Sequence, residues 1–369
     1  MWDAPNNRHC AVNAMKPDLG IIEGFYGPTW TWPEREQLVA TLAPAGYDFY
    51  LYAPKADPFL RRRWDENHPT DEAAALAAFS VYCRDRDVRF GIGLSPFEIF
   101  NRFDETAKAA LAAKLAFLDR IGVVDLAILF DDMRADTPDL AAVQADIVHW
   151  VKARSGADRL LMCPSYYSDD PVLDRVFGQR PAAYLEDLGA MLDPAVDVFW
   201  TGAEVCSREI TPGHLRRVSD QLRRKPVLWD NYPVNDGDRM SRHLHLRAFT
   251  GRPADNAGWL SGHAINPALQ STLTTIPALT LARSYLEGPG YDYGQAFKQA
   301  AVEVLGSELA ELITEDLLTL QDAGLARLSE PRRLALRKRY AAFAHPGARE
   351  IVRWLDGGYQ VTDEMVQTQ

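Results

Sequence analysis

The chain places carboxylates directly after short apolar segments, where buried strands are expected to end. Asp131 and Asp132 follow the apolar run at residues 126–130. Two adjacent carboxyl groups in a low-dielectric setting do not both ionise readily. The pKa of one is therefore expected to rise, so that this group acts as an acid while the other stays charged. The alternative is a helix N-cap, a position that aspartate also favours. A joint role requires the strand to end or bulge at the pair, because adjacent strand residues face opposite ways.

A lysine, several aromatic residues and several amides occupy comparable positions. Lys55 follows Pro54 after the apolar segment 47–52, and it is either a ligand contact or an ordinary surface lysine. Aromatic residues at the ends of four segments either pack in the core or stack on the apolar faces of pyranose rings; they are Tyr26, Tyr167, Trp200 and Trp229. Three further residues supply the donors and acceptors that sugar hydroxyls need, namely Asn231, Asp236 and Asn266.

The segments that carry these residues alternate between strand-like and helix-like patterns, as in repeated βα units. The predicted strands are residues 19–24, 47–52, 89–94, 124–130, 159–163, 196–200, 226–229 and 257–261. The predicted helices between them include residues 33–42, 70–84, 105–120, 138–153, 184–192 and 212–223. This order predicts an α/β fold, a (β/α)8 TIM barrel, whose site lies in the loops after the carboxyl ends of the strands.

The pattern changes after the predicted barrel. We expect a polar N-terminal arm at residues 1–17, the catalytic barrel at 18–285 and a small helical region at 286–369, with helices near 293–305, 308–321 and 331–343. The last of these helices carries a basic run, Arg332, Arg333, Arg337, Lys338 and Arg339. Such a run is either a solvated face or a docking surface.

Composition excludes several classes of function. With 40 Lys+Arg against 51 Asp+Glu, the net charge is −11, which argues against nucleic acid or an anionic membrane as a partner. Four scattered cysteines, at positions 10, 83, 163 and 206, form no disulfide framework or zinc spacing. No secretion signal or membrane span is evident, which predicts a cytoplasmic protein. The oligomeric state is left open.

Nucleotide, metal and serine-hydrolase motifs are absent from the chain, so we expect no cofactor and no metal. The glycines Gly91 and Gly93 lie within a predicted strand, which favours backbone packing. His243 and His245 have strand-like spacing but no third ligand nearby.

Taken together, the ordered motifs resemble the family 84 glycoside hydrolases, β-N-acetylglucosaminidases that include protein O-GlcNAcase. The resemblance covers residues 18–285. It rests on segments at the predicted strand ends, namely 20–27 (GIIEGFYG), 50–55 (YLYAPK), 129–132 (LFDD), 163–167 (CPSYY), 200–202 (WTG), 229–231 (WDN), 235–236 (ND) and 266–267 (NP). Two segments depart from the family pattern: residues 27–30 read GPTW instead of GRPW, and residues 55–57 read KAD instead of KDD. Both departures lie in loops that border the pocket. We therefore expect them to affect which leaving groups are accepted more than they affect the catalytic pair.

The resemblance implies a retaining, exo-acting hydrolase in which the substrate's own acetamido group attacks the anomeric carbon and forms an oxazoline. Asp131 would accept a hydrogen bond from the acetamido N–H, and Asp132 would act as general acid and then base. The sugar would be held by Gly24, Lys55, Asn231, Asp236 and Asn266. Tyr167 would steady the acetamido group, Trp229 would wall its methyl pocket, and Tyr26 would lie towards the leaving group.

Three functions follow as alternatives. The first is removal of GlcNAc from glycoproteins, and the second is hydrolysis of GlcNAc-containing oligosaccharides by the same chemistry. The third is a non-catalytic barrel that binds GlcNAc-bearing ligands, which the intact Asp131–Asp132 pair disfavours because a pure binder needs no acid.

Overall fold

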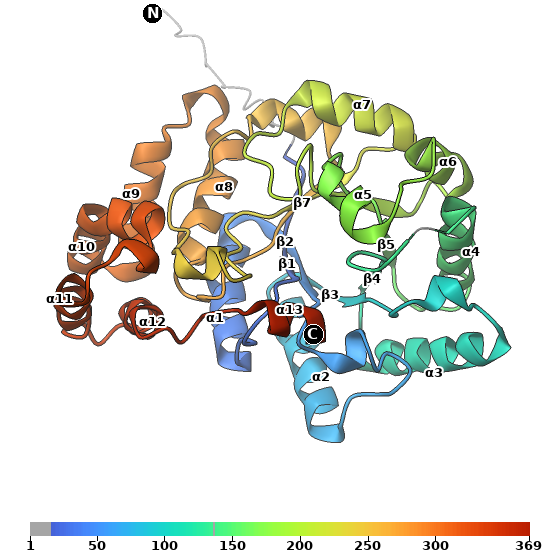
Figure 1. Ribbon diagram of the computed structural model, residues 1–369, viewed down its shortest axis with the longest axis horizontal. Coiled ribbons are helices and arrows are strands. Elements are labelled where there is room, and N and C mark those ends of the chain that lie inside the picture. The colour runs from blue at the N-terminus through green and yellow to red at the C-terminus, as the bar shows by residue number, and fades with distance from the viewer. Residues whose placement is uncertain (1–15, 136) are drawn as a thin grey trace, which may run out of the picture.

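A computed structural model describes residues 16–135 and 137–369, and its centre is a closed barrel of parallel strands (Figure 1). The strands follow one another around the barrel in chain order, and the last pairs with the first. Their bounds are β1 Asp18–Glu23, β2 Tyr47–Tyr52, β3 Arg89–Leu94, β4 Asp125–Leu129, β5 Arg159–Cys163, β6 Asp197–Trp200, β7 Val227–Asp230 and β8 Gly262–Ile265. The predicted TIM barrel is thereby confirmed.

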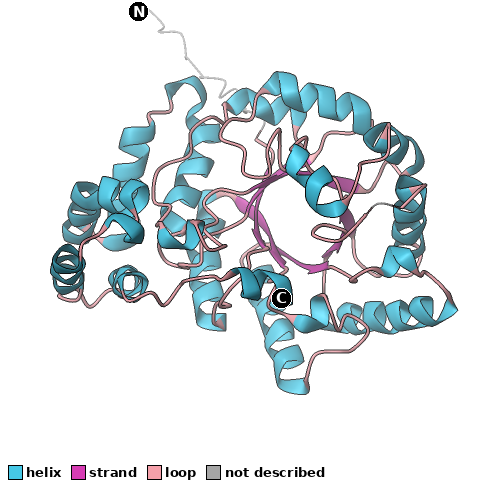
Figure 2. Cartoon of the chain, viewed as in Figure 1, coloured by secondary structure: helices cyan, strands magenta, loops and turns pink. Residues whose placement is uncertain are grey.

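Helices surround the strands on the outside of the barrel, as Figure 2 shows. They are α1 Trp32–Leu42, α2 Thr70–Arg84, α3 Glu105–Ile121, α4 Leu140–Lys152, α6 Tyr184–Met191, α7 Pro212–Leu222 and α8 Thr275–Glu287, whereas α5 Pro171–Phe177 lies in the loop after β5. Local sequence sets their ends. Thr31 and Glu34 form a capping box at the start of α1. Asp104 accepts hydrogen bonds from the backbone N–H groups of Thr106 and Ala107 at the start of α3, at 3.1 and 3.0 Å.

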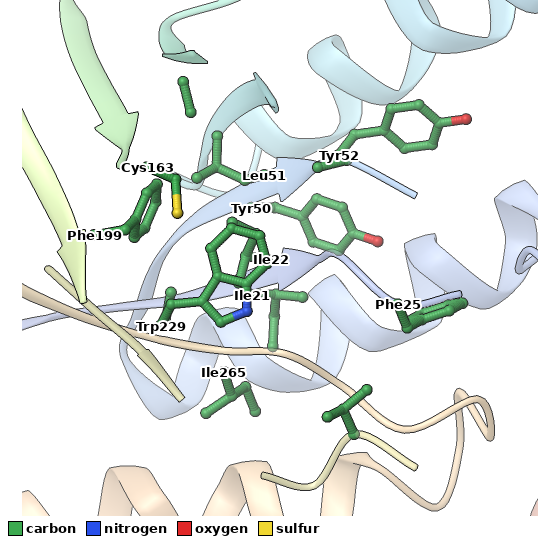
Figure 3. Close-up of a cluster of buried hydrophobic side chains, with 14 of the residues drawn as sticks. Ile21, Ile22, Phe25, Tyr50, Leu51, Tyr52, Cys163, Phe199, Trp229 and Ile265 are labelled. Carbon is green, nitrogen blue, oxygen red and sulfur yellow. The ribbon is translucent and has the colours of Figure 1, made fainter. Parts of the chain in front are cut away.

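Buried apolar side chains fill the barrel, because strands covered on both faces bury nearly every residue. Figure 3 shows side chains of β1, β2, β5, β6, β7 and β8 meeting in one cluster. Within it the rings of Phe199 and Trp229 meet edge to face, with centroids 5.4 Å apart. The carboxyl ends of all eight strands open on the same side of this core, which brings the polar residues after them together.

The eighth strand lies later than predicted. Residues 254–259 form a short 3₁₀ helix, and the strand is Gly262–Ile265. The sequence hides this strand because it contains a glycine and a buried histidine. His263 lies 3.0 Å from an Asp230 carboxylate oxygen and 2.9 Å from the Tyr285 hydroxyl, so its polar atoms are satisfied inside the protein. The helix α5, in the loop after β5, was not predicted.

Only helices follow the barrel. The first four pack on one side of it, at the left of Figure 1, and the last, next to the C-terminus, lies in front of the barrel. They are α9 Tyr293–Leu305, α10 Ser307–Leu317, α11 Glu330–Tyr340, α12 Pro346–Leu355 and α13 Asp363–Thr368, of which α12 and α13 were not predicted. On α11, four members of the basic run pair with acidic residues of this chain: Arg332 with Asp316, Arg333 with Glu330, Arg337 with Asp356, and Arg339 with both Glu315 and Asp316. These intramolecular pairs favour the solvated-face interpretation.

The chain's last residues return to the barrel. Gln369 accepts a hydrogen bond from the backbone N–H of Gly27 at 2.8 Å, and Arg62 donates to the carbonyls of Gln367 and Thr368 at 2.7 and 3.1 Å. The segment therefore joins the loops that follow β1 and β2.

The predicted arm at residues 1–17 falls outside the described residues except for Lys16 and Pro17, and Cys10 lies outside them as well. Lys16 pairs with Asp48 at 2.7 Å. Cys83, Cys163 and Cys206 are free thiols. Across residues 16–135 and 137–369, no helix combines the length and the apolar character needed to cross a bilayer.

Candidate active site

A pocket of about 170 Å³ opens at the carboxyl ends of the strands. Every residue to which the family resemblance assigns a catalytic role or a substrate contact lines it, together with several that were not predicted. The lining residues are Gly24, Tyr26, Lys55, Asp131, Asp132, Cys163, Tyr167, Thr201, Val205, Cys206, Trp229, Asn231, Val234, Asp236 and Asn266. The pocket is smaller than the roughly 300–1,000 Å³ of a site for a drug-sized ligand, which suits a single sugar ring.

Both adjacent aspartates face this pocket because the backbone changes direction between them. Strand β4 ends at Leu129, and Asp132 has a φ of +56°, in the left-handed region that aspartate tolerates better than most residues. The break cancels the alternation by which neighbouring strand residues would face opposite ways. The N-cap alternative is excluded, since the next helix begins at Leu140 and its N-cap residue is Asp139.

Lys55 joins the two aspartates. Its Nζ forms a short contact with Asp131 Oδ2 and lies 3.3 Å from Asp132 Oδ2. The residue is only 4% exposed, which excludes the surface-lysine alternative. Burial lowers the pKa of Lys55, but the two carboxylates raise it by more, so the ammonium stays charged. The other oxygen of Asp131, Oδ1, is buried and has no hydrogen-bond partner among the described residues.

Asp132 is held as a carboxylate by two tyrosines. The Tyr26 hydroxyl donates to its Oδ2 and the Tyr167 hydroxyl to its Oδ1, each at 3.0 Å. Burial raises the pKa of Asp132, but Lys55, Arg61 and the two hydroxyl donors outweigh burial and bring the pKa below its usual value. The sequence argument expected a raised pKa on one member of the pair. For Asp132 the direction is the opposite, because the sequence argument did not include this set of donors and cations.

Trp229 forms an apolar wall of the pocket. Its ring lies so close to Gly24 that a Cβ on that residue would be 2.4 Å from the indole, so only glycine fits there. The indole Nε1 donates to Asn231 Oδ1 at 3.1 Å. Trp200, which the sequence grouped with the sugar-stacking residues, is fully buried instead and donates to His214 on α7 at 2.9 Å. It packs between barrel and helix and does not line the pocket.

Two asparagines are fixed before any ligand arrives. Asn266 Oδ1 accepts from the backbone N–H of Gly24 at 3.2 Å, and its Nδ2 donates to Asn231 Oδ1 at 3.0 Å. Asn231 Nδ2 donates in turn to the carbonyl of Val205 at 2.8 Å. Amides with locked orientation present defined donors and acceptors to a ligand, which favours binding by reducing the entropy lost.

Asp236, in the loop after β7, supplies a third carboxyl group to the pocket. Its Oδ2 accepts from the backbone N–H of Tyr26 at 2.8 Å. Burial, partly offset by that hydrogen bond, raises the pKa of Asp236 to about 6, and the nearby charge of Asp132 adds to the rise. The group therefore changes charge close to neutral pH.

Sequence reasoning missed several lining residues and one supporting residue. Cys163 ends β5 and Thr201 directly follows β6, so their positions at strand ends could have indicated that they line the pocket. Val205, Cys206 and Val234 come from loop interiors that carry no such signal. Burial raises the pKa of the Cys206 thiol to about 11, so it is not an activated nucleophile. Arg61, which contacts the Asp132 backbone, lies in a run of three arginines that reads as ordinary loop surface.

The histidines considered as metal ligands are engaged with the backbone. His243 Nδ1 lies 2.8 Å from the Gln321 carbonyl, and His245 Nδ1 lies 3.0 Å from that of Pro233. Within the described part of the chain, no three His, Cys, Asp or Glu side chains gather closely enough to hold a metal ion. Gly91 and Gly93 pack tightly inside the barrel, where an added Cβ would lie 2.4 Å from Leu51 and 2.6 Å from Ala53, respectively.

Comparison with known proteins places this geometry among glycoside hydrolases. A family model described as beta-N-acetylglucosaminidase matches residues 19–319. The protein O-GlcNAcases of Mus musculus and Rattus norvegicus are each 31% identical over 275 residues, which is 72% of this chain and 30% of theirs. This chain thus spans less than a third of the length of those relatives.

Solved structures give the same result. A mutant O-GlcNAc hydrolase of Thermobaculum terrenum has a TM-score of 0.76 and 26% identity, over 93% of this chain and 81% of that one. A structure named CpGH84B, with a TM-score of 0.74 and 22% identity over 93% of this chain and 66% of its own, shares the fold. From the family match and the similarity to these relatives, the chain belongs to the β-N-acetylglucosaminidase family of glycoside hydrolases.

Proposed function

We propose that this protein is a retaining exo-β-N-acetylglucosaminidase that uses the 2-acetamido group of its substrate as the nucleophile. One observation carries the mechanism. Asp131 is 4% exposed, its Oδ2 is occupied by Lys55, and its Oδ1 is a buried acceptor without a partner among the described residues. A buried acceptor without a hydrogen bond is costly. The N–H of an acetamido group in the pocket would satisfy it.

In the first step, the acetamido carbonyl oxygen attacks the anomeric carbon and the bond to the leaving oxygen breaks. Asp131 holds the amide N–H and stabilises the positive charge that develops on the oxazolinium ring. Asp132 transfers its proton to the leaving oxygen, which departs as an alcohol. Lys55, whose ammonium pairs with Asp131, remains charged throughout.

Asp132 must be protonated to play this part, whereas Lys55, Arg61 and the two tyrosine hydroxyls favour its carboxylate. We infer that substrate changes the balance. When the Tyr167 hydroxyl turns to the acetamido group, Asp132 loses one of its donors, and the sugar excludes water from around it. Both changes raise the pKa of Asp132.

In the second step, water attacks the anomeric carbon from the side that the leaving group vacated. Asp132, now a carboxylate, takes a proton from this water, and the bond between the anomeric carbon and the acetamido oxygen breaks. The acetamido group is restored. Two inversions at one carbon give net retention.

We propose removal of O-GlcNAc from proteins as the cellular reaction. The two mammalian relatives are protein O-GlcNAcases, and the Thermobaculum protein is an O-GlcNAc hydrolase. A pocket with room for one sugar ring is consistent with exo cleavage of a single residue. Cleavage of a GlcNAc-modified peptide in preference to chitobiose would support this substrate class, whereas the reverse preference would favour the oligosaccharide alternative.

The acetamido group should be required for turnover. A β-glucoside with the same aglycone should react more than about 10²-fold more slowly than the β-GlcNAc glycoside, since it lacks an intramolecular nucleophile. Successive fluorination of the acetyl methyl withdraws charge from the carbonyl oxygen, so kcat/KM should fall at each step of the series. The measurement uses one nitrophenyl aglycone throughout, and a flat fluorine series would mean that a protein carboxylate attacks instead.

Asp236→Asn should weaken sugar recognition. Loss of a hydrogen bond to a charged group is worth about 1.5–3 kcal/mol, or roughly one to two decades in kcat/KM. With the wild type, KM should rise as the pH falls through about 6, because protonation removes the acceptor. The variant should lose this dependence. Asp238→Asn, an exposed position two residues away, is the control. Full efficiency in Asp236→Asn would exclude the assigned role.

A further inference from the structure

Arg61 is a buried cation next to the catalytic loop. It follows the short 3₁₀ helix Pro58–Leu60 after β2 and is only 4% exposed. Its Nη1 donates to Ser95 Oγ at 3.1 Å, and its Nη2 donates to the backbone carbonyl of Asp132 at 3.0 Å. The guanidinium therefore ties the loop after β2 to the peptide of Asp132.

The setting of Arg61 differs from that of the other deeply buried arginines. Arg35 forms a two-point pair with Glu23, and Arg252 forms one with Asp230. Arg61 makes no ion pair with any carboxylate of the described residues, and its Nε has no hydrogen-bond partner among them. The guanidinium carbon of Arg61 lies 5.3 Å from the centroid of the Phe97 ring, so its partners are an aromatic ring and neutral oxygens. Burying a charge without a carboxylate partner is unfavourable. A purely structural role would be served at lower cost by a neutral donor.

The carbonyl that Arg61 contacts belongs to a residue in an unfavourable backbone conformation. Asp132 has a φ of +56°, and this turn is what directs both adjacent carboxylates into the pocket. A hydrogen bond from a charged donor to that carbonyl opposes relaxation of the turn. The positive charge also contributes to the lowered pKa of Asp132.

We propose that Arg61 is a positioning residue for the general acid: it fixes the left-handed peptide of Asp132 and places a permanent positive charge beside that carboxyl group. The role of Asp132 as the acid rests on the proposed function. The other ionisable groups that face Asp132 from neighbouring elements are Lys55, Tyr26, Tyr167, Asp131, Asp236 and Cys163. The charge of Arg61 also lowers the pKa of Lys55 and of Tyr26, yet both pKa values stay above their usual range. Replacing Arg61 therefore leaves the charge of both groups unchanged near neutral pH.

Two substitutions separate the charge of Arg61 from its hydrogen bond. Arg61→Gln removes the charge but keeps an amide that can donate to the Asp132 carbonyl. Arg61→Lys keeps the charge but lacks the planar fork that reaches both Ser95 and Asp132. Arg63→Gln, an exposed member of the same run that pairs with Glu66, is the matched control.

The first readout is the pKa of Asp132 in the whole 369-residue chain, measured by NMR of ¹³C-labelled aspartate carboxyls and assigned with Asp132→Asn. Arg61→Gln should raise this pKa by about one unit, the lower end of the effect of a nearby charge. Arg61→Lys and the control should leave it near the wild-type value. An unchanged pKa in Arg61→Gln would overturn the proposal, as would failure of both Arg61 variants to fold.

The second readout is the pH profile of kcat on a glycoside with a poor leaving group. Its alkaline limb reports the acid in the substrate complex, so Arg61→Gln should move this limb to higher pH. Arg61→Lys should keep the limb but lose roughly tenfold in kcat on this substrate, with a smaller loss on an acidic phenol. Equal losses on both substrates with an unmoved limb would indicate a merely structural role. An inactive wild type would contradict the proposed function, whereas an unchanged Asp132 pKa in an active enzyme contradicts only the role of Arg61.

Discussion

Asp131→Asn should lower kcat/KM by about 10²- to 10³-fold on every β-GlcNAc glycoside, whatever its leaving group. The carboxylate orients the acetamido nucleophile and balances the charge of the oxazolinium ring, and both tasks are needed before and after the leaving group departs. An asparagine retains the size of the side chain but not the charge. Its amide nitrogen would also place a donor opposite the acetamido N–H. The measurement is kcat/KM across a series of aryl and alkyl glycosides.

Asp139→Asn is the matched control for this prediction. The residue lies in the same loop and is exposed, so the variant makes the same chemical change outside the pocket. Its kcat/KM should equal that of the wild type. A loss in Asp131→Asn that grows steadily with leaving-group pKa would show instead that Asp131 donates the proton.

Asp132→Asn should have an effect that depends on the leaving group. General acid catalysis contributes about 10²- to 10⁴-fold when the departing oxygen needs a proton. The kcat/KM of the variant should therefore fall steeply on alkyl or serine-linked GlcNAc. On a glycoside whose leaving group is a very acidic phenol, the rate of bond cleavage should stay close to that of the wild type. The measurement is the slope of log kcat/KM against leaving-group pKa for the wild type, Asp131→Asn and Asp132→Asn.

The two aspartate variants control for each other because they are adjacent and share the contact with Lys55. A steeper slope for Asp132→Asn than for Asp131→Asn supports the assigned roles. The opposite order would exchange them. Identical slopes would mean that the pair acts as one unit and that no single acid can be assigned.

The barrel could be predicted because its strands carry a strong local signal. In a parallel sheet covered on both faces, nearly every strand residue is apolar, so residues such as those of β2 and β4 stand out from amphipathic helices. The site could be predicted for a related reason. Polar residues such as Lys55 and Asn231 come directly after these strands, and the fold brings all carboxyl ends to one side.

The features that escaped prediction depend on contacts between distant residues. The lowered pKa of Asp132 comes from Tyr26, Lys55, Arg61 and Tyr167, on three other loops. The direction of the Trp200 side chain is set by His214 on a helix. Strand β8 includes His263, which can be buried only because Asp230 and Tyr285 satisfy its two ring nitrogens. None of these partners is visible from local spacing.

The hydrogen bond between Gly24 and Asn266 spans 242 residues of sequence, and it lies where β1 and β8 pair to close the barrel. The pocket therefore includes the seam of the barrel, by which we mean the junction where the first and last strands pair. During synthesis, Gly24 in the loop after β1 cannot form this hydrogen bond until Asn266, after the last strand, has been made. Contacts between residues so far apart in sequence slow folding. A ligand that touches both sides of this seam adds its binding free energy to the stability of the entire barrel, since the open chain cannot bind it.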